Sequence, residues 1–132
     1  MDCIFCKIIK GEIPSYKIYE DDYTYAFLDI SQEGFGHTLV VPKKHFASFL
    51  GCSKFYMQKC MEAVKKIGNH YINNCGFSGF NIIVNTNESA GQSVMHLHIH
   101  IIPRKDGDGL GLWDLKKDKT DLEKVRKMLE VK

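Results

Sequence analysis

The segment from Met95 to Pro103, MHLHIHIIP, constrains the fold most strongly, because histidine and aliphatic residues alternate along it. Successive side chains of a β-strand point to opposite faces of a sheet. The alternation therefore predicts a strand with aliphatic side chains packed on the core and three imidazoles, His96, His98 and His100, on the other face. Half of the six histidines of the chain fall within residues 96–100, which favours a functional row over three unrelated structural histidines.

Local patterns elsewhere predict four more strands and three helices. β-branched and aromatic runs indicate strands at 17–20, 23–29, 37–41 and 80–85. Apolar residues at helical spacing indicate one long helix over 55–74. Short helices are expected at 2–11, with Asp2 as N-cap, and near the C-terminus, where Thr120 and Glu123 match a capping box. The combination predicts an α+β fold with a mainly antiparallel sheet.

Size and charge limit the classes of function. The 132 residues suit a single domain, 1–132, and 18 basic against 16 acidic residues leave a formal net charge of only +2. Without a basic stripe we expect no nucleic-acid partner. No apolar run reaches the roughly eighteen residues of a membrane span and no export signal follows Met1, so we expect no membrane association. Five cysteines, an odd number, favour reduced thiols and a cytoplasmic location.

A small polar loop, ESAGQS at residues 88–93, directly precedes the histidine row. Such a loop can expose backbone N–H groups, and Ser93 adds a hydroxyl near the imidazoles. Loops of this composition are most often simple turns. Because this one adjoins three histidines, we interpret it as a cradle for phosphate.

The pattern HxHxHxx at residues 96–102 resembles the histidine-triad (HIT) family, in particular its nucleotide-binding branch. The resemblance covers roughly residues 2–112. It includes CIFCKII at 3–9, AFLDI at 26–30, GHTLVVPKKH at 36–45 and GQSV at 91–94. It implies a HIT-like fold with a five-stranded, mainly antiparallel sheet, one long central helix and short N- and C-terminal helices. It also implies a homodimer, and a single HIT domain with a core over 1–112 and a C-terminal extension over 113–132.

The resemblance further implies a site for a purine nucleotide. By this comparison the purine is flanked by Phe5, Ile8 and Phe27. The ribose hydroxyls would contact Asp29, with Leu28 and Ile30 beside it. The phosphate would be surrounded by Asn85, Gly91, Gln92, Ser93, Val94, His98 and His100, with His37 approaching from the neighbouring strand. All of these residue types are present in the chain.

The activity implied by the family is hydrolysis at the α-phosphorus of an AMP-type substrate. An imidazole with a pKa of about 6.5 is largely neutral at pH 7, so His98 would attack phosphorus and form a nucleotidyl intermediate that water cleaves. His100 and amides around Ser93 would stabilise charge on the phosphate oxygens. Ser93 and His100 are the two candidates for protonating the leaving group. Three substrate classes stay open: nucleoside phosphoramidates, aminoacyl-adenylates and dinucleoside polyphosphates.

Cys3 and Cys6 form a CxxC pair at a helix start, a spacing that suits one zinc ion. A redox-active pair is the alternative, although such motifs usually follow a strand in a βαβ unit. The zinc-bearing branch of the HIT family implies His45 and His96 as the other two ligands. The cofactor would be one structural zinc per chain, with no metal required for catalysis.

Two other functions stay open. All three triad histidines could hold a catalytic metal ion that activates water, although three ligands from alternate positions of one strand are geometrically awkward. The chain could also be a nucleotide-binding module whose hydrolysis is incidental to protein contacts. Trp113 in the extension could contact a partner's active site, or the extension could pack as a surface helix, and the sequence favours neither.

Overall fold

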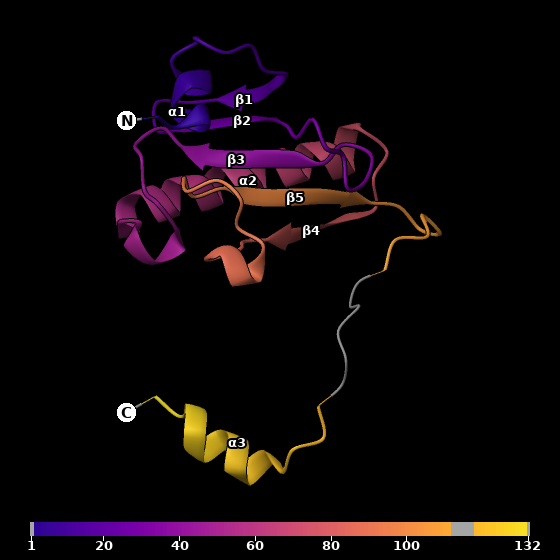
Figure 1. Ribbon diagram of the computed structural model, residues 1–132. Helices are drawn as coiled ribbons and strands as arrows, with labels where there is room; N and C mark the ends of the chain where they lie inside the picture. Colours follow the sequence, from indigo (N-terminus) through magenta and orange to yellow (C-terminus); the bar gives the residue numbers. More distant parts are fainter. Residues whose placement is uncertain (1, 112–117, 132) are drawn as a thin grey trace.

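The computed structural model describes residues 2–111 and 118–131, so the predicted role of Trp113 lies outside the described residues. The α+β class is confirmed: one five-stranded sheet lies in front of a long helix, α2 (Lys54–Asn74) (Figure 1). The strands are β1 (Lys17–Glu20), β2 (Thr24–Leu28), β3 (Thr38–Pro42), β4 (Gly79–Ile83) and β5 (Ile99–Arg104). The shorter helices are α1 (Ile4–Ile9) and α3 (Leu122–Leu129), and 3₁₀ turns occupy Phe49–Gly51 and Glu88–Ala90.

The strands of the sheet follow the order β1-β2-β3-β5-β4, and every neighbouring pair is antiparallel (Figure 1). β5, the last of these strands in the sequence, therefore lies between β3 and β4. Leu39 of β3 pairs with Phe27 on one side and with His100 on the other. Directly paired residues share a face of a sheet, so the last triad histidine and Phe27 lie on the same side.

Each face of the sheet packs on a different helix. One face packs on α2, in a core cluster formed by Ala26, Val40, Ile99 and Ile101 of the sheet and Cys60, Ala63, Val64, Ile67 and Tyr71 of the helix. The opposite face carries α1, whose Phe5 and Ile8 pack in a second cluster with Cys3, Tyr25, Phe27, Leu39 and Val41. Because side chains alternate along β5, Ile99 and Ile101 point to α2, whereas His100 points to the face that carries α1. This is the predicted separation of aliphatic and imidazole faces.

β5 begins at Ile99, so the prediction of a regular strand from residue 95 is wrong at its first four positions. The ladder with β3 ends at the pair Val40 and Ile99. Beyond it, the N–H of Leu97 donates to the carbonyl of Phe46 at 2.7 Å, in the segment that follows β3. The chain at 96–98 is therefore held by isolated contacts, and its side chains are free of the strict alternation of a strand.

The helix caps also differ from two predictions. At α1 the N-cap is Cys3, whose Sγ accepts the N–H of Cys6 at 3.4 Å, while Asp2 lies 3.2 Å from Lys7 Nζ at the surface. At α3 the N-cap is Asp121, without a side-chain bond, so the predicted capping box is absent at α3. The N–H of Thr120 donates to Asp118, and Glu123 pairs with Arg126 instead. The predicted capping residues therefore have other partners: Asp2 pairs with Lys7, Thr120 with Asp118, and Glu123 with Arg126.

α2 matches its prediction within one residue. Ser53 caps it by accepting the N–H of Tyr56 at 3.2 Å, and Gly76, with φ of 83°, follows its C-cap. Gly68 faces the ring of Phe80 on β4 so closely that an added methyl group would overlap with the ring. This glycine lets α2 approach the edge of the sheet. None of the helices within residues 2–111 and 118–131 combines the length and apolar character needed to cross a membrane.

Candidate functional site

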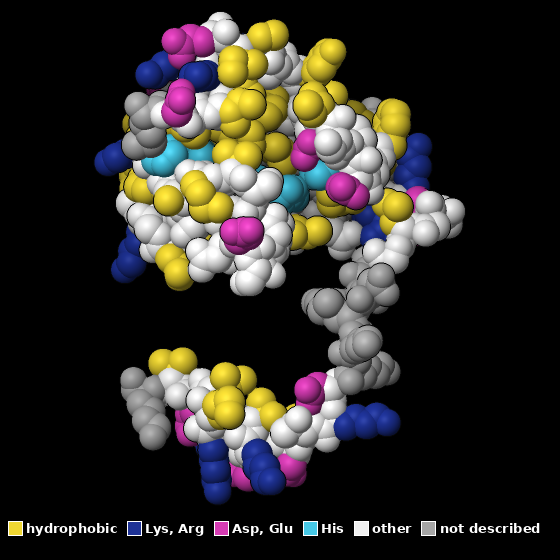
Figure 2. Space-filling model, in the orientation of Figure 1, with side chains coloured by type: hydrophobic (Ala, Val, Ile, Leu, Met, Phe, Trp, Pro, Cys, Tyr) yellow, Lys and Arg dark blue, Asp and Glu magenta, His cyan; other side chains and the backbone are white. Residues whose placement is uncertain are grey.

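Histidine side chains lie in two groups, separated by other side chains, along one band across this face of the molecule (Figure 2). His37, His96 and His98 are buried, and His100 is half-buried. The three triad histidines have different hydrogen-bond partners. The row predicted from the sequence is therefore one band that contains three distinct environments.

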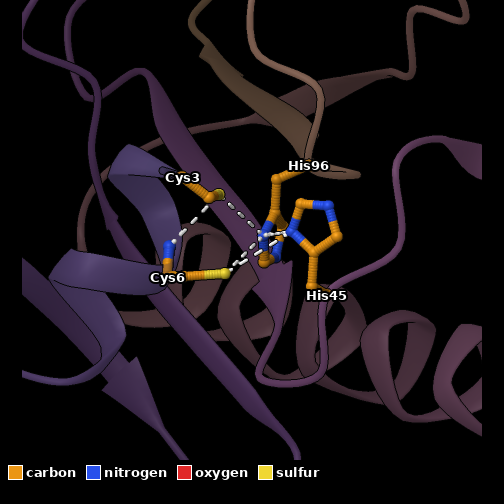
Figure 3. Close-up of side chains that lie close together, drawn as sticks. All are labelled: Cys3, Cys6, His45 and His96. Carbon is orange, nitrogen blue, oxygen red and sulfur yellow. Dashed lines mark hydrogen bonds between the residues drawn. The ribbon is translucent and has the colours of Figure 1, made fainter. Parts of the chain in front are cut away.

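Cys3, Cys6, His45 and His96 form a four-donor cluster in this band (Figure 3). The cysteines come from the start of α1, His45 from the segment after β3 and His96 from the segment before β5. Nδ1 of His96 lies 3.4 Å from Cys3 Sγ, 3.5 Å from Cys6 Sγ and 3.2 Å from His45 Nδ1. Cys6 Sγ lies 3.5 Å from His45 Nδ1. The structure brings together all four residues predicted as metal ligands.

The geometry of the four-donor cluster fits zinc. Bonds of about 2.0–2.1 Å to nitrogen and about 2.3 Å to sulfur give a tetrahedron with edges of roughly 3.3–3.8 Å, close to the spacings found. Nε2 of His96 donates to the carbonyl oxygen of Pro42 at 2.9 Å, which leaves the Nδ1 lone pair facing the cluster. Burial is the main cause that lowers the pKa of His96 to about 4, so the ring is neutral, as a metal ligand must be.

The cysteine pair also suits a cation. Burial and then the neighbouring Cys3 thiol raise the pKa of Cys6, because the charged form is poorly solvated and two adjacent thiolates repel each other. A dication between the two sulfurs would offset both effects. Cys3 is only 6% exposed, whereas a redox-active thiol needs access to solvent. The burial therefore favours the metal over the redox alternative.

Among the described residues, only one ring nitrogen of His98, the middle triad histidine, has a hydrogen-bond partner. Its Nδ1 donates to the carbonyl oxygen of His96 at 2.8 Å, so the neutral ring carries its lone pair on Nε2. The ring of Phe5 packs edge-on against it, with centroids 5.1 Å apart and planes at 83°. Burial lowers the pKa of His98, although the His96 carbonyl opposes the shift. The ring is therefore a neutral nucleophile or base at pH 7.

His100 and His37 form a hydrogen-bonded pair on adjacent strands. His37 Nδ1 accepts the backbone N–H of Glu33 at 3.2 Å, so the neutral ring carries its proton on Nε2 and donates to His100 Nδ1 at 2.9 Å. His100 must then carry its own proton on Nε2, which is buried without a hydrogen-bond partner in the described part of the chain. Burial, followed by His98 and His37, lowers the pKa of His100 to about 4. His100 thus presents a neutral N–H donor.

The carboxylate of Asp29 lies next to this pair, with Oδ2 3.7 Å from His37 Nε2, so Asp29, His37 and His100 form a second group of possible metal ligands. The group does not fit a metal ion, because the bond from Glu33 places the proton of His37 on the nitrogen where a metal would need a lone pair. His98 belongs to neither donor cluster. Within residues 2–111 and 118–131, the three triad histidines therefore form no common metal site of the kind that the sequence left open.

The loop before the triad is shaped by two residues with positive φ, Asn87 at 73° and Gly91 at 97°. Gln92 is buried, and its side-chain oxygen accepts the N–H of Asn87 at 2.9 Å. Its side-chain nitrogen donates to two carbonyl oxygens at 2.7 and 3.0 Å. The Gln92 amide is thus engaged inside the protein and holds the loop in shape. Ser93 is exposed, and the half-buried Asn85 lies beside Gly91.

The residues predicted to contact base and ribose come from α1 and the end of β2: Phe5, Ile8, Phe27, Leu28, Asp29 and Ile30. The rings of Phe5 and Phe27 pack edge-to-face, 5.5 Å apart, and both are buried. Asp29 is half-buried and accepts the N–H of Ser31 at 2.8 Å. Ile30 is 88% exposed. The structure therefore forms a buried aromatic wall next to His98, with a carboxylate at its edge.

A cavity of about 450 Å³ lies beside the four-donor cluster. It is lined by Asp2, Cys3, Ile4, His45, Ser93, Val94 and Met95. It connects the metal ligands with the loop before the triad. Asp2, Ile4 and Met95 were missed as site residues because they contribute surface without a motif. The backbone groups of Glu33 and Pro42 were missed because any residue type can supply them.

Comparison with known proteins identifies a matching family. The family model for the HIT domain matches residues 10–107, well over half of the chain. The chain belongs to the HIT-domain family. The HIT-domain match includes His45 and the triad and begins after the cysteine pair, so Cys3 and Cys6 lie outside the matched residues.

Relatives in the HIT-domain family cover most of the chain. Protein hit of Bacillus subtilis is 49% identical over 111 residues, which are 83% of this chain and 77% of that protein. Adenosine 5′-monophosphoramidase HNT1 of Candida albicans is 40% identical over 134 residues, with 97% and 87% covered. The crystal structure of a zinc-bound histidine triad family protein from Mycobacterium smegmatis matches with a TM-score of 0.80 at 32% identity, covering 94% of this chain and 87% of that one. Nucleotide hydrolysis is supported at the level of the HIT-domain family.

Proposed function

We propose that this protein hydrolyses AMP-type substrates at the α-phosphorus through a covalent nucleotidyl-His98 intermediate. One observation carries the proposal: the His96 carbonyl fixes the proton of His98 on Nδ1 at 2.8 Å, and this leaves a neutral Nε2 as the attacking atom. The same ring is supported by Phe5, one of the residues that we propose for the purine site.

The proposed nucleotide site follows the band of histidines. Phe5, Ile8 and Phe27 would stack on the base, and Asp29 would accept hydrogen bonds from the ribose hydroxyls, beside Leu28 and Ile30. The phosphate would lie among Asn85, Gly91, Gln92, Ser93, Val94, His98 and His100, with His37 behind His100. This assignment is supported by the aromatic wall, by the exposed Ser93 and by the buried N–H donor on His100.

The proposed reaction has two steps. The lone pair of His98 Nε2 forms a bond to the α-phosphorus, while the bond from phosphorus to the leaving nitrogen or oxygen breaks. The leaving group takes a proton, for which Ser93 and His100 are the candidates. Water then forms a bond to phosphorus as the bond from phosphorus to Nε2 breaks, and it gives up a proton that restores the residue that protonated the leaving group, so the nucleoside monophosphate is released. The Nε2–H of His100, buried without a partner among the described residues, would donate to a phosphoryl oxygen as its charge grows.

The four-donor cluster would hold one structural zinc ion through Cys3, Cys6, His45 and His96. When bound, zinc would cross-link α1 to the segment after β3 and to the segment before β5. It would take no part in the reaction at phosphorus. The support comes from the donor spacings and the tautomer of His96. All five cysteines are free, which supports the cytoplasmic location that we propose.

We further propose a homodimer that forms through β4 and α2. β4 is an edge strand, and its Ile82 and Ile83 are 47% and 44% exposed. Ile72 on α2 is 39% exposed. An edge strand with apolar side chains suits pairing with a second chain.

Turnover of adenosine 5′-phosphoramidate tests the proposal. We expect AMP release by the unaltered protein, loss of release in His98→Ala, and a phosphorus-linked adduct trapped on the unaltered protein only. His70→Ala is the matched control, because His70 is exposed on α2 and bonds only to Asn74 among the described residues. Diadenosine polyphosphates as competitors would rank the leaving groups. Tight AMP binding without turnover of any substrate would overturn the hydrolase and identify a nucleotide-binding module instead.

A further inference from the structure

We propose that metal binding at the four-donor cluster and nucleotide binding beside His98 are energetically coupled, so that zinc raises the affinity for nucleotide and nucleotide retains zinc. This inference rests on the proposed function, because it requires a nucleotide next to Phe5 and His98. Two connections carry it: the short helix α1 and the backbone of His96.

α1 contributes to both sites within a few residues. Cys3 and Cys6 face the four-donor cluster, whereas Phe5 and Ile8 are buried against the sheet at 7% and 8% exposure. A helix of six residues is not stable by itself. Its position must therefore be set by the contacts that its side chains make.

Within residues 2–12 the backbone hydrogen bonds run inside this segment, and none of those found in the described chain joins it to the sheet. The N–H of Lys10 donates to Cys6 at 3.1 Å, and the N–H of Glu12 donates to Lys7 at 2.9 Å. Apolar packing and the metal donors are thus the two anchors of α1. When the metal leaves, only apolar packing remains, chiefly that of the buried Phe5 and Ile8, and these are the side chains that the base would contact.

Phe5 is the first connection between the sites. Its ring centroid lies 5.9 Å from that of His96, a metal donor, and 5.1 Å from that of His98. The same ring lies 5.5 Å from Phe27 on the proposed purine wall. A shift of α1 would therefore disturb the wall and the side support of His98 together.

The backbone of His96 is the second connection. Its imidazole belongs to the four-donor cluster, while its carbonyl oxygen accepts the ring Nδ1–H of His98 at 2.8 Å. Metal coordination restrains the His96 side chain and, through it, the peptide that orients His98. His96 acts here as a positioning residue, since it reaches the substrate only through His98.

The pair of His37 and His100 lies outside this coupling. Its hydrogen bonds run between the two rings and to the backbone of Glu33, and its described contacts include His98 but none with α1. Loss of metal should leave this pair intact. The difference offers an internal control: imidazole signals of His98 should respond to zinc, and those of His37 should not.

Linkage makes the coupling testable from both sides, because each ligand must change the affinity of the other by the same factor. Isothermal titration calorimetry with AMP would compare the zinc-loaded full chain with the chain stripped by a chelator. We expect binding about 10-fold weaker without zinc. In the reverse experiment, transfer of zinc to a chromophoric chelator would be timed with and without saturating AMP, and we expect AMP to slow it several-fold.

Phe5→Leu and Phe55→Leu form a matched pair of variants. Phe5→Leu removes the ring between the two sites, so the ratio of AMP affinities with and without zinc should fall toward one. Phe55 is 49% exposed near the start of α2 and packs on Tyr23, so Phe55→Leu should keep the ratio.

Each possible result supports or overturns the coupling between zinc and nucleotide. Equal AMP affinity in both metal states, with zinc release unaffected by AMP, overturns the coupling and leaves the proposed function intact. Failure of AMP to bind either state overturns both, and failure to bind zinc overturns the coupling. Circular dichroism checks whether the stripped chain is folded. If the stripped chain is unfolded, the zinc-transfer measurement alone tests the coupling, because it starts from zinc-loaded, folded protein.

Discussion

His37 Nε2 lies 2.9 Å from His100 Nδ1, and this contact sets which nitrogen of His100 carries a proton. The direction of this hydrogen bond is set by a third group, the backbone N–H of Glu33, which donates to His37 Nδ1 at 3.2 Å. One backbone amide therefore determines the tautomer of two rings in succession. The last group of this short relay is the buried Nε2–H of His100, which would donate to the phosphate.

His37→Ala should lower kcat/KM for adenosine 5′-phosphoramidate by roughly 5-fold to 150-fold, the equivalent of one lost hydrogen bond to a buried group. Without its donor, His100 can move its proton to Nδ1 and stop donating through Nε2. Steady-state kinetics of this variant and of His70→Ala, the exposed-histidine control, would measure the effect. Equal activity of the two variants would contradict the relay.

The free energy of unfolding should fall in acid because of His100. Its pKa is about 4 in the folded protein, below the ordinary value of about 6.5 in the unfolded chain. Between these values the unfolded state binds more protons, so the stabilisation is complete above about pH 6.5 and is lost as the pH falls toward 4. The loss from this group is at most about 3 kcal/mol.

Urea unfolding at pH 7 and pH 5 would measure this dependence, with His100→Gln as the comparison. Both proteins keep the four-donor cluster, so metal loss in acid affects them alike. The variant should lose less stability between the two pH values than the unaltered protein. An identical pH dependence would assign the acid sensitivity to other groups.

Zinc removal should lower the melting temperature by about 10 °C, since a ligand at a hundredfold excess over its Kd contributes roughly 2.7 kcal/mol. Cys3→Ser should reproduce the loss, because it removes one of the four donors. Cys75→Ser is the control: Cys75 is exposed after α2 and lies outside the cluster. Differential scanning calorimetry and metal analysis would be compared for the three proteins. A chelator-independent melting temperature would argue against the structural metal.

Gly68→Ala should destabilise the fold by about 1–3 kcal/mol, because the new methyl group would overlap with the ring of Phe80. Helix propensity alone predicts the opposite sign, since alanine is favoured over glycine by about 1 kcal/mol. Gly51→Ala adds the same methyl group where nothing lies within 4 Å. Urea unfolding should separate the two variants, and a stabilised Gly68→Ala protein would show that the ring moves aside readily.

The predictable parts of the fold are the segments in which apolar residues recur at the regular spacing of a strand or a helix. Alternation along 99–101 and helical spacing over 55–74 describe the faces of β5 and α2 correctly, because burial imposes these periods. The strand start at Ile99 was not predictable from alternation, since it depends on the contact between Leu97 and Phe46. The N-cap at Cys3 was missed because Asp2, the better capping residue by type, lies next to it.

The cluster of four metal donors was predictable as a set of side chains, whereas the proton positions on the histidines were not. Motifs and family resemblance pointed to the four metal donors, and the structure brings them together. The proton positions on His37, His96 and His98 depend instead on backbone N–H and carbonyl groups. Such groups carry no residue-type signal, so only the folded geometry reveals them.

The position of β5 has a consequence for synthesis on the ribosome. Since β3 and β4 meet only through β5, a nascent chain that has emerged as far as β4 displays an unpaired edge on β3 and a strand without a neighbour. The donor His96 comes just before β5, 93 residues after Cys3. Completion of the sheet and loading of the metal therefore both wait for the same late stretch of polypeptide, and a chain stalled before it would expose an aggregation-prone meander.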